Sequence, residues 1–161
     1  SIGFTGDYQI EDGSGAVVNN FNDGVKIHRL NAFVAGTVDG DFAAEGITSG
    51  DAVAYSDFVY DPFSATPAMW SVGSFTFDLV NASKNYMSAT ELLLSGNGWI
   101  TSTTEGLDDT FGVWNFSANN AGSNFTWSSS TAASVPEPGI ALLLGAGLIG
   151  FGVVRKLRKA A

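Results

Sequence analysis

The sequence of 161 residues contains no cysteine and only one histidine, His28. The absence of cysteine excludes disulfide bonds and a thiol nucleophile, so packing alone must stabilise the fold. Because ordinary zinc sites use several cysteine and histidine ligands, a chain with no cysteine and one histidine nearly excludes such a site. A Ser-His-Asp triad would have to use His28, and no Gly-x-Ser-x-Gly elbow precedes a helix. We therefore predict that the protein is not an enzyme, and that His28 points to solvent beside Lys26 on a strand.

Basic side chains are scarce and are divided unevenly along the chain. Residues 1–134 hold 15 acidic and 3 basic side chains, for a formal charge of −12, and the remaining residues carry +3. Nucleic acids are bound through Lys and Arg, so the acidic body excludes nucleic acid as a partner. No cofactor is expected, and Ca²⁺ is the alternative because it takes oxygen ligands. Its candidate ligands, which lack the spacing of an EF-hand, are the loop carboxylates Asp39, Asp41, Asp108 and Asp109.

Short alternating runs between turn residues indicate that residues 1–127 form an exported β domain. Phe75, Phe77 and Leu79 alternate with polar residues, which is typical of a strand with one buried face. Turn signals recur at intervals of roughly 10–16 residues and favour an antiparallel β-sandwich or jelly-roll-like body of about 8–10 strands. Residues 128–134, rich in Ser, Thr and Ala, are expected to be a flexible linker.

One segment of the body is ambiguous. The stretch Tyr86–Leu94 has helix-forming residues, but its neighbours favour a strand. We expect that strand to end at a turn formed by Ser95-Gly96-Asn97-Gly98, because Asn-Gly is a common turn dipeptide.

Tryptophan is the residue type in the body that is best suited to ligand contact. An exposed indole stacks on the apolar face of a sugar ring, whereas a buried indole packs in the core. The candidates for sugar contact are Trp70, Trp99, Trp114 and Trp127.

The C-terminus has three consecutive parts within residues 135–161. A short motif, Val135-Pro136-Glu137-Pro138-Gly139, precedes an apolar run over residues 140–154. The run can form a helix of about 16–19 residues, or roughly 24–28 Å, which nearly spans a bilayer core. A basic cluster follows, formed by Arg155, Lys156, Arg158 and Lys159. Because basic clusters stay on the cytoplasmic side, the body is expected to lie outside the inner membrane.

Small residues are spaced along the apolar run as in packed membrane helices. Two small-xxx-small pairs favour close helix approach, and their members are Ala141 with Gly145 and Ala146 with Gly150. At the other end, the chain starts at Ser1 without an apolar leader. We expect a mature chain from which a secretory signal has been removed.

The C-terminal pattern resembles the PEP-CTERM sorting signal of Gram-negative bacteria. The resemblance covers residues 135–161, and Leu157 within the basic cluster is a mild departure from the usual pattern. It implies an exosortase-type enzyme as the processing partner, with Pro136, Glu137 and Pro138 as the residues recognised. It also implies a membrane-anchored intermediate on the periplasmic side, followed by delivery to the cell surface or extracellular matrix.

Three functions fit these observations. The leading hypothesis is a non-enzymatic surface or matrix protein that is associated with exopolysaccharide in a biofilm. The second is a structural subunit of a filament, in which self-assembly uses an edge strand such as residues 2–10. The third is a carbohydrate-binding module that uses exposed tryptophans.

Overall fold

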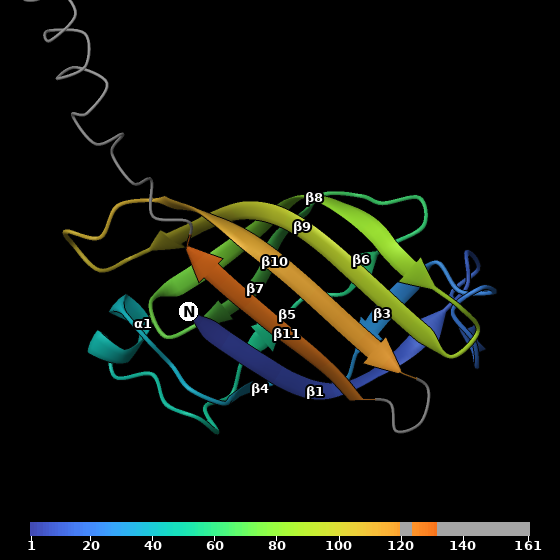
Figure 1. The fold of residues 1–161 in the computed structure, drawn as a ribbon, viewed down its shortest axis with the longest axis horizontal. Helices are drawn as coiled ribbons and strands as arrows, with labels where there is room; N and C mark the ends of the chain where they lie inside the picture. The colour runs from blue at the N-terminus through green and yellow to red at the C-terminus, as the bar shows by residue number, and fades with distance from the viewer. Residues whose placement is uncertain (120–123, 132–161) are drawn as a thin grey trace, which may run out of the picture.

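The computed structural model describes residues 1–119 in full and the backbone of residues 124–131. This part of the chain folds into antiparallel strands with one short helix (Figure 1). In chain order the elements are β1 (Ile2–Glu11), β2 (Val17–Val18), β3 (Lys26–Arg29), β4 (Phe33–Ala35), α1 (Asp41–Ala44), β5 (Ala54–Tyr55), β6 (Phe58–Val59), β7 (Thr66–Val72), β8 (Phe75–Met87), β9 (Glu91–Ser102), β10 (Thr110–Asn119) and β11 (Asn124–Thr131).

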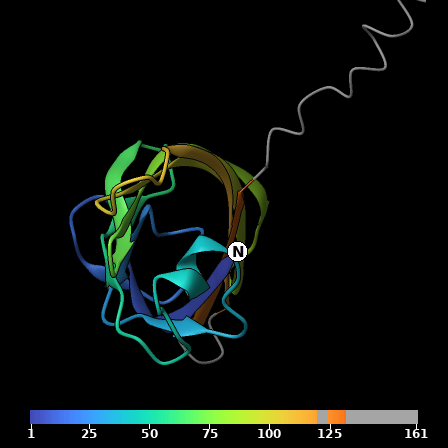
Figure 2. The same ribbon diagram turned by 90° about the vertical axis from the view of Figure 1, so that its left-hand side faces the viewer.

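The strands form two antiparallel sheets that share β1, which is consistent with a sandwich. The larger sheet has the order β5-β7-β8-β9-β10-β11-β1, with β4 also beside β1, and the smaller sheet joins β1 to β2, β3 and β6. Seen from one end, the strands curve around a common interior (Figure 2). The β-sandwich prediction is confirmed, and the described residues hold eleven strands, of which several are only two to four residues long.

Strand β1 passes from one sheet to the other near Gly6. Residues Ile2–Asp7 pair with β11, whereas Tyr8–Glu11 pair with β3. At Gly6 a Cβ atom would collide with the carbonyl oxygen of Asn31, so a residue without a side chain is needed there. Strands therefore flank β1 on both sides, and the prediction of a free edge at residues 2–10 is wrong. The partner strand β11 lies more than 110 residues away in the sequence, and alternation within β1 carries no information about it.

The interior is built from alternating apolar side chains, many of them aromatic. Phe75, Phe77 and Leu79 are all buried, as their alternation predicted. Trp70 packs at 5.0 Å from the ring of Phe4 and at 5.6 Å from that of Phe77. Burial of such large rings is the main stabilising contribution in a chain without disulfides. The largest fully buried side chains are Trp70, Trp114, Tyr60, Phe4, Phe21, Phe58, Phe77, Phe116, Ile2 and Ile27.

The turn expected at residues 95–98 lies instead at residues 88–90. Strand β8 continues to Met87, and residues 95–98 lie inside β9. The hydroxyl oxygen of Ser88 accepts hydrogen bonds from the backbone N–H groups of Thr90 and Glu91, which stabilises the turn at this point. Gly96 and Gly98 are needed for a different reason, because a Cβ atom at either position would collide with a carbonyl oxygen of β8.

The last described strand is longer than the sequence predicted. Residues 128–131, expected to begin the linker, complete β11 and pair with β10, and residues 128 and 129 also pair with β1. The neighbouring strands β10 and β1 hold this Ser/Thr segment through backbone hydrogen bonds. Such bonds do not depend on the side chains, so polar residues can form a strand here. Within residues 1–119 and 124–131, no helix has the length and hydropathy of a membrane span. The apolar helix expected at residues 140–154 lies outside the described residues.

Candidate functional site

The four tryptophans are not equivalent. Trp70 and Trp114 are completely buried in the core, whereas Trp99 is 46% exposed. The side chain of Trp127 lies outside the described residues. The prediction of sugar contact is therefore wrong for Trp70 and Trp114, because both indoles alternate onto the inner face of their strands. Sequence alone does not distinguish the inner from the outer face for an isolated tryptophan.

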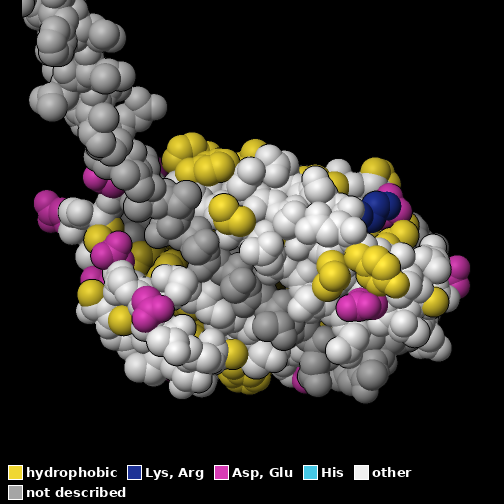
Figure 3. All heavy atoms as spheres, viewed as in Figure 1, with side chains coloured by type: hydrophobic (Ala, Val, Ile, Leu, Met, Phe, Trp, Pro, Cys, Tyr) yellow, Lys and Arg dark blue, Asp and Glu magenta, His cyan; other side chains and the backbone are white. Residues whose placement is uncertain are grey.

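Trp99 forms part of an exposed apolar surface, which we call the aromatic patch and define as Trp99, Phe111 and Val113. Trp99 on β9 lies directly opposite Phe111 on β10, with ring centroids 5.1 Å apart in an edge-to-face arrangement. Phe111 and Val113 are exposed on the same face of β10, at 41% and 39%. In Figure 3 hydrophobic side chains gather over the left-hand part of β9 and β10. Three large exposed hydrophobic side chains on adjacent strands form a surface that can hold a ligand or a partner.

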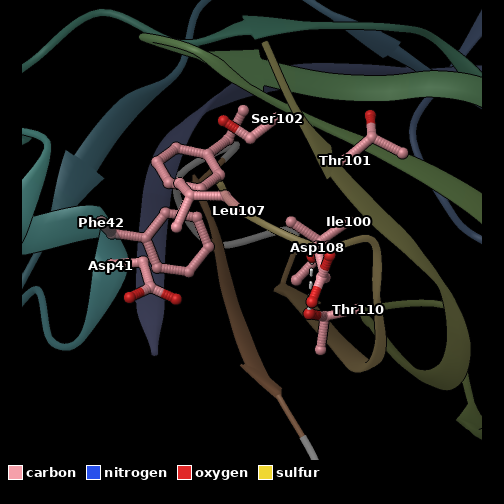
Figure 4. A pocket seen from close by; sticks show the side chains of 9 residues that line it. Asp41, Phe42, Ile100, Thr101, Ser102, Leu107, Asp108 and Thr110 are labelled. Carbon is pink, nitrogen blue, oxygen red and sulfur yellow. Dashed lines mark hydrogen bonds between the residues drawn. The ribbon is translucent and has the colours of Figure 1, made fainter. Parts of the chain in front are cut away.

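The candidate calcium ligands are only partly brought together. Asp41 and Asp108 line the same small pocket, where Figure 4 shows them on opposite sides, Asp41 beside Phe42 and Asp108 beside Thr110. Asp39 and Asp109 do not line this pocket, and Asp39 accepts a hydrogen bond from the Ser1 hydroxyl. Among the described residues, no three acidic, histidine or cysteine side chains group closely enough to hold a metal ion.

The size of this pocket also limits its chemistry. Its volume of about 30 Å³ has room for one or two water molecules. A sugar ring or a metabolite needs a site roughly ten times larger. The pocket lining is completed by Phe75, Ile100, Thr101, Ser102 and Leu107.

His28 belongs to a charged cluster whose members are distant in the sequence. His28 and Lys26 share one face of β3, as predicted, and both contact Asp57. His28 Nδ1 lies 2.8 Å from Asp57 Oδ2, and Lys26 Nζ lies 2.8 Å from Glu11 Oε2 on β1 and 3.1 Å from Asp57 Oδ2. The alternation of Lys26 and His28 was a signal for a shared face, but nothing in the sequence indicates Glu11 and Asp57 as partners.

Electrostatics in this cluster favour the charged forms of Asp57 and Lys26. Partial burial acts to raise the pKa of Asp57, but hydrogen bonds from the Arg29 backbone N–H, His28 and Lys26 outweigh it and hold that pKa below its ordinary value. The hydrogen bond to Glu11 is the main cause that raises the pKa of Lys26. Within the described part of the chain the side-chain partners of His28 are carboxylates, so this arrangement ties β1, β3 and the β5–β6 segment together.

The clearest functional information lies at the C-terminus, beyond the described strands. A β body followed by a short motif, an apolar run and a basic cluster defines an exported protein that is sorted through its tail. More specifically, residues 134–158 match the model of the PEP-CTERM protein-sorting motif, so the chain carries this motif. The motif implies an exported protein that is processed by an exosortase. No curated protein and no solved structure matches the chain.

Proposed function

We propose that the protein is a non-enzymatic component of the cell surface or the extracellular matrix, associated with exopolysaccharide. The sorting motif at residues 134–158 is the observation that carries this proposal, because the motif implies an exported protein. In this proposal the body leaves the cell through a membrane-anchored intermediate. In this intermediate the basic cluster lies on the cytoplasmic side and residues 1–131 lie outside.

The body supports a structural role in two ways. Its long strands β8, β9 and β10 form a continuous antiparallel surface. The charged cluster around Asp57 supplies cross-links between strands, which suits a stable extracellular module without disulfides.

The test is to substitute the motif and follow the protein in its native cells. A chain with Pro136→Ala, Glu137→Ala and Pro138→Ala should remain in the inner-membrane fraction, while the unchanged chain reaches the surface or matrix. Glu105→Ala, which removes an exposed acidic side chain from a body loop, is the matched control and should be sorted normally. Cell fractionation with immunoblotting and intact mass measures both outcomes. Equal distribution of the motif variant and the control would contradict the proposal.

Self-assembly into a filament is a second candidate, with a different strand as its contact. Residues 81–87 of β8 pair with β9 on one side, and no other described strand pairs with them. An unpaired edge of this length can accept a strand from another copy. Two irregularities in the β8–β9 register and the Lys84–Asp61 ion pair, at 2.6 Å, are features that commonly protect such edges. A purified full chain that stays monomeric at high concentration would eliminate this candidate.

Carbohydrate binding is a third candidate, and it rests on Trp99. Among the tryptophans whose side chains are described, Trp99 alone is exposed, and Phe111 extends its surface. A matrix polysaccharide should change the fluorescence of the unchanged chain but not that of the Trp99→Ala variant. No difference between the two chains would rule out binding at this surface.

A further inference from the structure

The aromatic patch lies beside the point where the described chain ends. Thr131, the last residue of β11, pairs with Gly112 on β10. Phe111 and Val113 are the two neighbours of Gly112, and Trp99 lies opposite Phe111. Paired residues on adjacent strands have Cα atoms about 4.5–5.5 Å apart, so the patch begins within roughly 10 Å of Thr131.

The membrane cannot be far from this point once the tail is inserted. Eight residues, 132–139, separate Thr131 from the apolar run at residues 140–154. A fully extended chain of this length reaches about 26–29 Å at most. Strand β9 has 12 residues and is therefore about 40 Å long, so the tether is shorter than the body. The end of the body that carries the patch is thus held near the bilayer surface.

The chemistry of the patch fits the interfacial region of a bilayer. Tryptophan is enriched where the hydrocarbon core meets the headgroups, because its ring is apolar and its N–H is polar. Residues 91–119, which form β9, β10 and their connection, include no Lys or Arg and four acidic side chains. Such a surface is repelled by anionic lipids and is compatible with zwitterionic ones. Tethering raises the effective concentration of the patch at the membrane, so a small apolar surface is sufficient for contact.

We propose that the aromatic patch docks on the zwitterionic lipid surface of the membrane while the tail is inserted. The partner is the headgroup region of the outward-facing leaflet, and the contact holds the body against the bilayer beside its own sorting motif. Cleavage of the tail ends the tethering, so the patch leaves the membrane and is exposed in the extracellular protein. This inference rests on the membrane-anchored intermediate of the proposed function.

The test uses the full chain in phosphatidylcholine vesicles that contain brominated lipid, which quenches nearby tryptophan. The fluorescence of Trp99 is obtained as the difference in tryptophan fluorescence between the unchanged chain and the Trp99→Phe variant. The matched control adds Tyr86→Trp to the Trp99→Phe variant, because Tyr86 is 49% exposed and Trp99 is 46% exposed. Tyr86 pairs with Leu93, six residues from Trp99 along β9, or about 20 Å away.

Quenching should be several-fold stronger for Trp99 than for the tryptophan of the Tyr86→Trp control. Vesicle flotation measures insertion of the tail in the same samples and separates the two possible failures. Chains that do not float would refute the anchored intermediate and this inference with it. Chains that float with equally weak quenching at both positions would overturn the docking contact alone. Protection of Trp99 from an aqueous quencher, without quenching by lipid, would assign the patch to a second copy or another partner and would also overturn it.

Discussion

Replacement of Gly98 by alanine should destabilise the body strongly, although it adds only one methyl group. Gly98 is buried in β9, opposite Leu79 of β8. A Cβ atom there would collide with the carbonyl oxygen of Asp78 and would lie 2.8 Å from Cζ of Phe77. The Phe77 ring is fully buried and the carbonyl belongs to the backbone, so neither can move without disturbing the β8–β9 pairing.

The size of the effect follows from two opposing contributions. Overpacking of a core typically costs about 1–3 kcal/mol, and a collision with backbone belongs at the upper end of that range. Alanine lowers the conformational entropy of the unfolded chain relative to glycine, which stabilises the folded state by about 0.4–1 kcal/mol. We therefore expect a net loss of about 2–2.6 kcal/mol in the free energy of unfolding. For a body of this size that loss lowers the melting temperature by roughly 10 °C.

Gly13→Ala is the control, because Gly13 lies in the turn after β1 with no atom within 4 Å of an added Cβ. It should leave the stability unchanged or raise it slightly. Thermal and urea unfolding of the detergent-solubilised full chain, followed by near-ultraviolet circular dichroism, measures both variants. If Gly98→Ala were as stable as Gly13→Ala, the close approach of the β8 and β9 backbones would be wrong.

Three further outcomes are expected. The pKa of Asp57 is lowered in the folded state, so its contribution to stability is present above a pH of about 4 and is lost as the pH falls through the folded pKa. In a series of urea unfolding measurements at different pH values, the free energy of unfolding of Asp57→Asn should fall less steeply at acid pH than that of the unchanged chain. Equal slopes for the two chains would contradict this. Burial raises the pKa of Tyr8 to about 12, so its contribution to the stability of the fold is complete below the unfolded pKa of about 10 and is lost as the pH rises toward 12. In a titration followed by phenolate absorbance, the Tyr8→Phe variant should show one fewer tyrosine that ionises at high pH than the unchanged chain. Trp114→Ala should cost about 3–5 kcal/mol because the indole is fully buried. Trp99→Ala should cost only about 0.5–1.5 kcal/mol, through loss of its ring contact with Phe111. Similar losses in urea unfolding would refute the assignment of faces.

The local pattern of the sequence predicted the strands whose two faces differ most. In β8, Phe75, Phe77 and Leu79 are buried and alternate with the polar residues Thr76 and Asp78. Such alternation is a property of neighbouring residues, so it can be read without knowledge of the fold. The C-terminal motif was equally accessible, because its three parts are contiguous in the chain.

Features that depend on distant pairing could not be predicted in this way. Asn97-Gly98 has the composition of a hairpin turn, yet Gly98 is needed because β8 passes close to it. The charged cluster joins Glu11, Lys26 and Asp57, which are separated by 15 and 31 positions in the chain. Sequence alone shows that each residue is charged, but only the register of β1 and β3 brings the first two together.

The pairing of β1 with β11 has a consequence for the order of events during export. If the chain crosses the membrane from its N-terminus, β1 emerges first and must wait for β11, which follows more than 110 residues later. Its place between β4 and β11 in the larger sheet cannot be completed until Ser129, the partner of Ile2, has crossed, when ten residues remain before the apolar run. Contacts between such distant segments form slowly, because a long loop must close before they are made. In the membrane-anchored intermediate proposed above, the tail is therefore arrested before or while the last strand pairs, and a processing enzyme would meet a body that is still completing its fold.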